Sequence, residues 1–377
     1  MRLQWHIFCR VVDNFGDIGV CWRLAQQLVR EHQQVLTLWV DDLNSFNAIC
    51  PNASTAAAEQ TVNGVEIRHW REIVDVSLAA HADVVIEAFA CDLPEAWLVS
   101  MAQREPQPQW LNLEYLSAEA WTLDCHLGCS PLAGMQRVFF FPGFAAGSGG
   151  VLIDNELLAT AETLKSATAQ QTFLASLGVV EDGLFDRRIS LFAYENPAVE
   201  TLLAALANDP TTSHLFVPTG RVTADVERWL GWALIEGASL QRGSLTITPL
   251  PFMSQLEYDG LLAICDFNCV RGEESFVRSQ VLGKPTLWHI YPQDDNAHID
   301  KLEAFLEVYL ADADVQLASQ ISVLSLHWNQ VHGAIGDWPA VLQRLPIWQQ
   351  HAEGWRQHLM SNGDLASNLV TYVKNRV

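Results

Sequence analysis

The chain has 377 residues, of which 49% are hydrophobic and 18% charged, and its 44 acidic side chains outnumber 22 basic ones. This composition excludes a disordered chain, and the length fits two domains of ordinary size. The net charge of −22 argues against binding to nucleic acid, which needs clustered Lys and Arg. It fits either a basic partner or simple solubility.

Signals for export or membrane insertion are not visible. The N-terminal residues contain no long apolar run followed by a small-residue cleavage site, and no stretch approaches the roughly 18 apolar residues of a membrane span. We therefore expect a cytoplasmic protein that does not associate with a membrane. The eight cysteines are expected to be reduced core residues, and no metal site is expected, although Cys125/Cys129 and Cys265/Cys269 are each separated by three residues.

In the first half of the chain, short apolar strands alternate with helical patterns. Apolar residues recur at helical spacing after the first strand, for example at Cys21, Leu24 and Leu28. Alternating strands and helices predict a parallel sheet with helices on both faces. The strands expected here span residues 6–12, 35–40, 65–69, 83–87, 110–113 and 137–141.

A second series of strands and helices follows a stretch rich in Gly and Pro at residues 141–150. Helices are expected at 197–207 and 224–236, and the tail from about Trp338 also has a helical pattern. The strands expected in this series span residues 189–194, 215–217, 245–248, 263–269 and 285–290.

These patterns predict an α/β protein of two Rossmann-like domains that face each other across a cleft. We expect an N-terminal acceptor domain at 1–155, an interdomain region at 156–187 and a nucleotide-sugar domain at 188–377. The helical tail could pack back on the first domain. Because ligands of such sheets bind beyond the carboxyl ends of the strands, functional residues are expected where strands end.

The first candidate site is the segment 13–19, Asp-Asn-Phe-Gly-Asp-Ile-Gly, between the first strand and the first helix. The glycines allow tight turns, and the carboxylates of Asp13 and Asp17 are expected at the carboxyl end of the strand. The segment matches neither a P-loop nor the G-x-G-x-x-G pattern. The alternative is a local role for either Asp as a helix N-cap or turn residue.

The second candidate site is the segment Arg271-Gly-Glu-Glu-Ser, where an apolar strand meets a helix. A helix N-terminus attracts phosphate, Gly272 lets the backbone approach it, and Arg271 supplies a permanent cation. The Ser275 hydroxyl could also donate to phosphate, whereas the carboxylates of Glu273 and Glu274 suit sugar hydroxyls. The alternative is a capping box with a solvated acidic first turn.

Aromatic residues at other strand ends of the second half could complete a nucleotide pocket. Phe192 and Tyr194 end the first strand there, and Tyr291 follows the last one. Phe252 could stack on a nucleobase, and the Gln255 amide could bond to the edge of that base. The alternative for each residue is an ordinary place in the core.

Both candidate sites carry a resemblance to a known family. Residues 7–24, Ile-Phe-Cys-Arg-Val-Val-Asp-Asn-Phe-Gly-Asp-Ile-Gly-Val-Cys-Trp-Arg-Leu, are very similar to the start of the protein-arginine rhamnosyltransferases called EarP. Residues 266–280, Asp-Phe-Asn-Cys-Val-Arg-Gly-Glu-Glu-Ser-Phe-Val-Arg-Ser-Gln, are similar to the nucleotide-sugar segment of that family. With the same strand order and length, the resemblance covers essentially the whole chain.

The resemblance implies a GT-B fold and an inverting, metal-independent transfer that needs no cofactor. It implies dTDP-β-L-rhamnose as the donor co-substrate and an arginine of translation elongation factor P as the acceptor, so that the modification activates this factor. It also implies that activity depends on Asp13, Asp17 and Glu273.

A mechanism can be written from the chemistry of arginine, whose guanidinium is protonated with a pKa above about 12. A carboxylate must hold this cation and remove a proton as the new bond forms. Our hypothesis makes Asp17 the general base, with Asp13 and Asn14 also binding the acceptor. Two other readings stay open from the residues alone: an epimerase or small-acceptor transferase with the same fold, and a nucleotide-sugar-binding protein without turnover.

Overall fold

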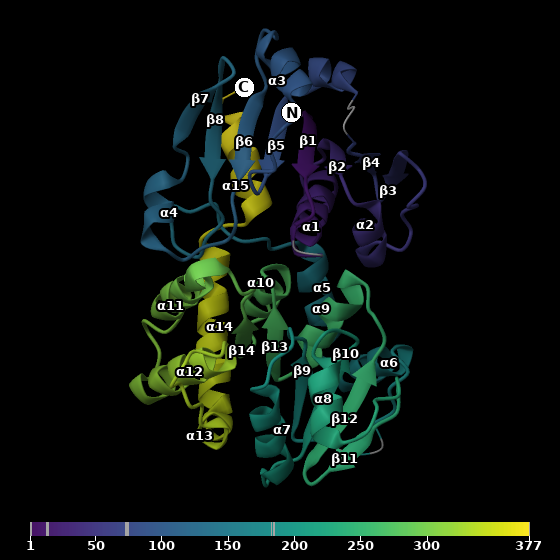
Figure 1. Cartoon of the computed structure of the whole chain (residues 1–377), viewed down its shortest axis with the longest axis vertical. Coiled ribbons are helices and arrows are strands. Elements are labelled where there is room, and N and C mark those ends of the chain that lie inside the picture. The colour runs from purple at the N-terminus through teal and green to yellow at the C-terminus, as the bar shows by residue number, and fades with distance from the viewer. Residues whose placement is uncertain (1, 13–14, 72–74, 182, 184, 377) are drawn as a thin grey trace. The chain divides into compact units, whose positions relative to one another are not determined.

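The computed structural model describes residues 2–12, 15–71, 75–181, 183 and 185–376. The chain is an α/β protein that divides into two units, Met1–Asp154 with Ser361–Val377, and Asn155–Met360 (Figure 1). The segment 156–187, expected between the domains, belongs to the second unit. The last helix belongs to the first unit, which agrees with the expectation that the helical tail could pack back on the first domain.

The described residues of the first unit form an eight-stranded sheet in the order β3-β4-β2-β1-β5-β6-β8-β7. Its six central strands pair in parallel, and β3 and β7 pair antiparallel at the two edges. The strands are β1 (Gln4–Cys9), β2 (Val35–Val40), β3 (Glu59–Val62), β4 (Val65–His69), β5 (Val84–Ala88), β6 (Gln109–Leu113), β7 (Cys129–Leu132) and β8 (Met135–Phe140).

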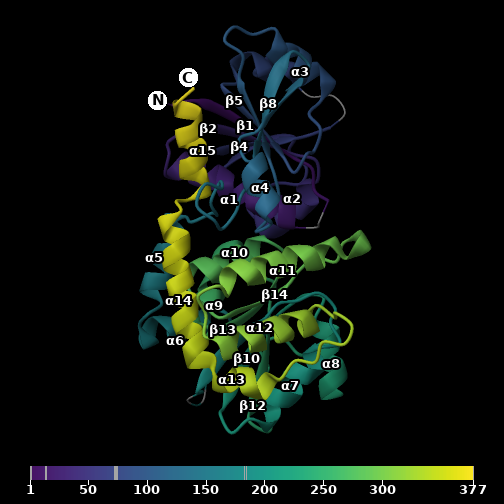
Figure 2. The same cartoon turned by 90° about the vertical axis from the view of Figure 1, so that its left-hand side faces the viewer.

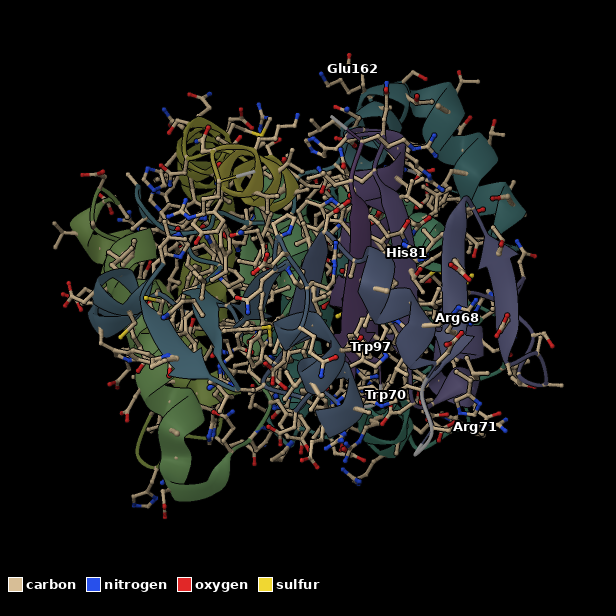
Figure 3. All side chains as sticks on the ribbon, turned by 90° about the horizontal axis from the view of Figure 1, so that it is seen from above. Arg68, Trp70, Arg71, His81, Trp97 and Glu162 are labelled. Atoms are coloured by element: carbon tan, nitrogen blue, oxygen red, sulfur yellow. The ribbon has the colours of Figure 1, made fainter. Side chains whose placement is uncertain are left out.

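Helices cover both faces of this sheet because its central strands are buried on both sides. In β1, Trp5 and Ile7 belong to one core cluster, whereas Phe8 belongs to the cluster on the opposite face. The rings of Trp70 and Trp97, labelled in Figure 3, both meet Phe8 edge-on, at centroid distances of 5.3 and 4.9 Å. The helices are α1 (Gly16–Arg30), α2 (Leu43–Ile49), the 3₁₀ helix η1 (Val76–His81), α3 (Glu95–Ala102), α4 (Ala120–Cys125) and α15 (Leu365–Lys374).

The described residues of the second unit form a six-stranded sheet in the order β11-β12-β10-β9-β13-β14. All neighbours in it are parallel except β11 and β12. The strands are β9 (Arg187–Leu191), β10 (Ser213–Pro218), β11 (Leu240–Arg242), β12 (Leu245–Leu250), β13 (Phe267–Arg271) and β14 (Thr286–His289).

The helices of the second unit surround its sheet, and a buried ion pair fixes two of them together. Arg278 and Asp259, each with a side chain 1% exposed, join α10 to α9 through an Nη2–Oδ2 contact of 2.7 Å. The helices are α5 (Asn155–Thr163), α6 (Ala167–Ser176), α7 (Val199–Asn208), α8 (Thr223–Leu230), α9 (Gln255–Ile264), α10 (Glu274–Val281), the 3₁₀ helix η2 (Asp294–Asn296), α11 (Ala297–Tyr309), α12 (Val315–Trp328), α13 (Trp338–Gln343) and α14 (Leu345–Ser361).

The structure confirms the two parallel sheets and corrects several bounds. Residues 263–264 belong to α9 rather than to a strand, and the first strand ends at Cys9 instead of residue 12. The helix expected at 224–236 ends at Leu230, because Gly231 adopts φ 76° in the left-handed region and closes it. Two cysteines expected in the core, Cys125 and Cys129, are exposed, while the other six are buried.

The strand orders place a topological switch point in each sheet. From the central strand, the chain builds one side of the sheet first and then crosses to the other, at β1/β5 in the first unit and β9/β13 in the second. Doubly wound sheets bind ligands at the carboxyl ends of these strands. Within the described part of the chain, no helix has the length and apolarity that crossing a membrane requires.

Candidate functional site

Asp17 lies in the first turn of α1, just after the carboxyl end of β1, where the sequence predicted it. Its side chain is 3% exposed, and its Oδ2 accepts a hydrogen bond from the Val12 backbone N–H at 2.9 Å. The N-cap of α1 is Phe15, so Asp17 is not the N-cap, although its bond to Val12 is a local contact of the kind that the alternative role as a turn residue allows.

Tyr115 holds the second oxygen of the same carboxylate. It lies two residues after β6, and its hydroxyl donates to Asp17 Oδ1 at 3.1 Å. Its ring stacks on Phe89, which follows β5, at 4.4 Å between centroids. Sequence reasoning missed Tyr115, although its place at a strand end was a usable signal. Asp13 and Asn14, the other predicted acceptor residues, lie outside the described residues.

In the second unit, Arg271 and two predicted aromatic residues come together at the switch point. Arg271 ends β13, and the guanidinium carbon lies 4.2 Å from the centroid of Phe192 and 5.0 Å from that of Tyr194. Both rings follow β9, the neighbouring strand, which ends at Leu191. The contacts hold a permanent cation against aromatic faces at the end of the sheet where ligands bind.

Gly272 and Ser275 form the turn from β13 into α10. Gly272 has φ 64°, and its carbonyl accepts a hydrogen bond from the Trp288 indole N–H at 2.8 Å. The Ser275 hydroxyl donates to the Arg271 carbonyl, so in this conformation it does not offer its proton to a phosphate. The strand-to-helix turn is as predicted, but the hydroxyl is used within the turn.

Glu273 is the N-cap residue of α10, and its carboxylate bonds to a lysine. Among the described residues, no side chain makes a cap hydrogen bond at this helix, so the capping-box alternative does not hold here. Instead Lys301 Nζ, from α11, lies 2.5 Å from Glu273 Oε1, with the two side chains 15% and 20% exposed. The sequence carried no signal for this pairing. The capping box of this region is at Ser254 and Glu257, on α9.

The remaining predicted donor residues lie along the same edge of the sheet. Phe252 is 51% exposed and follows β12, while Gln255 is the first residue of α9. Glu274, partly buried, is the first residue of α10. Tyr291, which follows β14, meets the Tyr194 ring edge-on at 5.5 Å between centroids.

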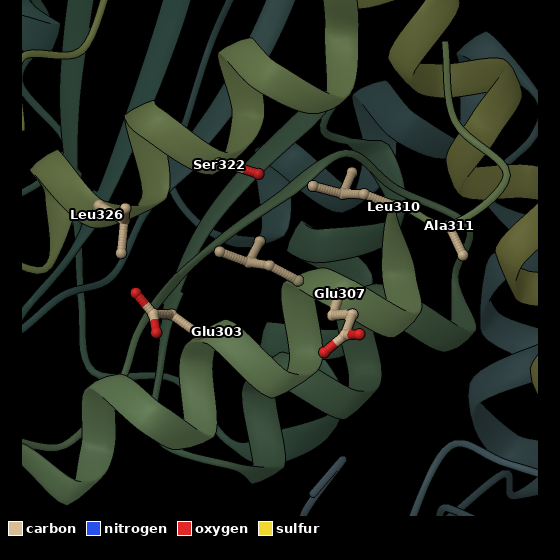
Figure 4. Close-up of a pocket in the computed structure, with 7 residues that line it drawn as sticks. Glu303, Glu307, Leu310, Ala311, Ser322 and Leu326 are labelled. Atoms are coloured by element: carbon tan, nitrogen blue, oxygen red, sulfur yellow. The ribbon is translucent and has the colours of Figure 1, made fainter. Parts of the chain in front are cut away.

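A separate pocket of about 310 Å³ lies between α11 and α12 and contains none of the predicted site residues (Figure 4). Leucine side chains line it together with the carboxylates of Glu303 and Glu307. No three His, Cys, Asp or Glu side chains among the described residues are grouped to hold a metal ion. That the sugar transfer needs no metal ion stays a prediction.

The comparison with protein families decides the identity of the chain. The model of the family described as Elongation-Factor P (EF-P) rhamnosyltransferase EarP matches residues 5–374. The chain belongs to this family. The resemblance of its two segments to EarP is thereby confirmed, and the chain is an enzyme, a glycosyltransferase of the protein-arginine rhamnosyltransferase kind.

Relatives with similar sequences support the EarP assignment. Protein-arginine rhamnosyltransferases of Pseudomonas putida and Pseudomonas aeruginosa are each 48% identical to the chain, covering 100% and 98% of both sequences, respectively. A solved structure is 37% identical to the chain, covers 100% of both chains and has a TM-score of 0.70. It is described as the structural basis for EarP-mediated arginine glycosylation of translation elongation factor EF-P.

More distant structures bear on the fold alone. MurG of Acinetobacter baumannii has a TM-score of 0.51 at 12% identity and covers 100% of both chains. A UDP-GlcNAc 2-epimerase of Neisseria meningitidis has a TM-score of 0.53 at 10% identity, covering 99% of this chain and 100% of the other. The GT-B architecture is confirmed, and because an epimerase shares it, the fold cannot by itself separate the transferase from the epimerase reading. Family membership does so.

Proposed function

We propose that this enzyme transfers L-rhamnose from dTDP-β-L-rhamnose to an arginine side chain of translation elongation factor P, with inversion at the anomeric carbon and without a metal ion, and that this activates the factor. The observation that carries the proposal is the EarP family match over residues 5–374. The residues at both switch points suit the chemistry that such a transfer requires.

On the acceptor side, Asp17 is the general base of the proposal. As an arginine nitrogen attacks the anomeric carbon, the bond from that carbon to the diphosphate oxygen breaks, and the proton leaves the nitrogen for the carboxylate. Tyr115 and the Val12 amide, each bonded to one oxygen of Asp17, orient it for this step. Asp13 and Asn14 would hold the guanidinium in the same proposal.

On the donor side, dTDP departs with additional negative charge. Arg271, which is permanently cationic, and the N-terminus of α10, whose helix dipole favours an anion, would stabilise that charge. Glu273, held by Lys301, would accept hydrogen bonds from hydroxyls of the sugar or ribose. Phe252 and Gln255 would bind the base.

The direct test mixes the full chain with dTDP-rhamnose and elongation factor P from the same organism and measures intact mass. We expect the factor to gain one deoxyhexose, joined as the α anomer because inversion of a β donor produces it. A factor of unchanged mass would refute the assignment, and a β-linked product detected by NMR would refute inversion.

A pair of variants tests the role of the base. Asp17→Asn should abolish transfer and leave dTDP affinity within a few fold. Asp42→Asn is the matched control, because Asp42 caps α2 and asparagine caps a helix equally well. A comparable loss of dTDP affinity in Asp17→Asn would reassign Asp17 to donor binding.

A further inference from the structure

Arg221 is a second arginine at the carboxyl edge of the second sheet, and the proposed function gives it no role. It follows β10 by three residues, and its guanidinium carbon lies 5.7 Å from the centroid of the Tyr194 ring. Arg221 follows β10, Tyr194 follows β9 and Arg271 ends β13. The sheet order is β10-β9-β13, so the strand that precedes Tyr194 is the middle one of the three. Two guanidinium groups therefore lie against one tyrosine ring.

A buried, uncharged side chain lies beside these arginines. His289 meets the Tyr194 ring edge-on at 5.3 Å. Burial, with Arg271 and Arg221 adding to it, lowers the pKa of His289 to about 4, so the imidazole is neutral at pH 7. The two arginines thus lie beside a neutral, buried imidazole. An anion bound there could accept paired hydrogen bonds from two guanidinium groups.

Within the described residues, Glu195 forms an ion pair with Arg221. Its Oε2 lies 2.6 Å from Arg221 Nε, and the two side chains are 54% and 48% exposed, respectively. The guanidinium beside Glu195 holds the pKa of that carboxyl below its usual range, so the pair is charged at neutral pH. An ion pair this exposed contributes little to stability, so a stronger anion can replace the carboxylate.

We infer that Arg221 and Arg271 together bind the diphosphate of the nucleotide sugar, and that Glu195 occupies Arg221 until the diphosphate replaces it. The inference rests on the proposed function, since it takes a nucleoside diphosphate sugar as the donor. A phosphate accepts two parallel N–H bonds from a guanidinium and carries more charge than one carboxylate, which favours the exchange. Glu195 is then a competitor of the ligand rather than a part of its site.

This arrangement predicts opposite effects for the two partners of one ion pair. Arg221→Ala should weaken dTDP binding about tenfold or more, because a charge-assisted bidentate contact is lost. Glu195→Gln should tighten it about threefold, because the competing anion is gone while the side-chain shape is kept. If the ion pair had no part in binding, both substitutions would change the dTDP affinity only slightly and without opposite signs.

The experiment titrates dTDP, and separately thymidine, into the full chain by calorimetry. Thymidine lacks phosphate, so its affinity should be the same in wild type, Arg221→Ala and Glu195→Gln. Arg242→Ala is the matched control, because Arg242 also lies over an aromatic ring, Trp229 at 4.2 Å, but on the antiparallel edge strand β11. Its dTDP affinity should equal that of wild type.

Arg221→Lys keeps the charge but loses the paired N–H donors of the guanidinium, so it should bind dTDP with intermediate affinity. Thermal unfolding of every variant checks that it is folded. Unchanged dTDP affinity in a folded Arg221→Ala, or weaker binding in Glu195→Gln, would overturn the inference while rhamnose transfer by the wild type still upheld the proposed function. A wild type that neither binds dTDP nor transfers rhamnose would refute the proposed function itself.

Discussion

Asp17 and Tyr115 meet across 98 positions of sequence, and their contact belongs to the proposed acceptor site. Tyr115→Phe removes only the hydroxyl that donates to Asp17. A hydrogen bond to a charged group contributes about 1.5–3 kcal/mol, so kcat should fall about tenfold or more. Affinity for dTDP should not change. The measurement is steady-state kinetics with elongation factor P.

Tyr372→Phe is the matched control for this variant. It removes a hydroxyl from the same unit, on α15, where the ring packs over Arg376 at 3.8 Å instead of meeting Asp17. Equal kcat values for Tyr115→Phe and wild type would show that this hydrogen bond does not orient the base.

His289 makes the stability of the second unit depend on pH. Its side chain is 2% exposed, and its pKa of about 4 lies below the value near 6.5 of a histidine in an unfolded chain. Between these two pH values the unfolded chain binds a proton that the folded one does not. The free energy of unfolding should therefore decrease as pH falls from about 6.5 to 4, by up to about 1.4 kcal/mol per unit.

Urea unfolding of wild type and His289→Phe at pH 7 and pH 5 isolates this contribution. The phenyl ring keeps a ring between Tyr194 and Trp328 but cannot bind a proton. Other titrating groups, such as His6, whose pKa burial lowers to about 3, are present in both proteins and cancel in the comparison. We expect the wild type to lose more stability than the variant, and equal losses would contradict the assignment.

At the scale of elements, the buried parallel strands were predictable and the edge strands were not. β2 and β4 occupy the predicted ranges because their apolar runs are bounded by polar or turn residues. The missed strands β3, β7 and β11 are three or four residues long, pair antiparallel and are mostly exposed. Such edges bury too little to show a hydrophobic pattern, and Pro131 in β7 further weakens the signal.

The turn between β13 and α10 carries most of the residues of the proposed donor site. Its sequence predicted a strand meeting a helix, and Gly272 adopts the left-handed φ that such a tight junction favours. The partners that fix the junction come from elsewhere: Trp288 from β14 bonds the Gly272 carbonyl, and Lys301 from α11 bonds Glu273. Local sequence therefore determined the turn, and tertiary packing determined its contacts.

At the scale of the whole molecule, the chain returns to its first unit after building the second. Figure 2 shows α15, in yellow, running along the first sheet, where Leu369 and Val373 join the core. Val151 pairs with Asp364, and the Leu365 N–H donates to the Val151 carbonyl at 2.9 Å. Asp364 also accepts from Gln27 on α1 at 2.9 Å, so the C-terminal segment completes the first unit.

Substitutions at two glycines test how closely the C-terminal segment packs on the first unit. A Cβ on Gly150 would lie 2.5 Å from the Gly363 carbonyl oxygen, whereas one on Gly147 would meet nothing within 4 Å. Both have positive φ, so each Gly→Ala change costs about 1–2 kcal/mol of backbone strain. Gly150→Ala should destabilise the first unit by more than this, measured as the free energy of unfolding. If Gly147→Ala were equally destabilising, the close approach of the C-terminal segment would be wrong.

The sequence by itself determined the two parallel α/β sheets, the positions of both motifs at strand ends and the resemblance to EarP. These are local properties, since they depend on apolar periodicity, on glycines at turns and on runs of contiguous residues. Only the tertiary structure decided that Tyr115 holds Asp17, that Lys301 holds Glu273 and that α15 belongs to the first unit. Each of these joins residues far apart in the chain, and a contact made by packing across strands leaves no periodic pattern in the sequence of either partner.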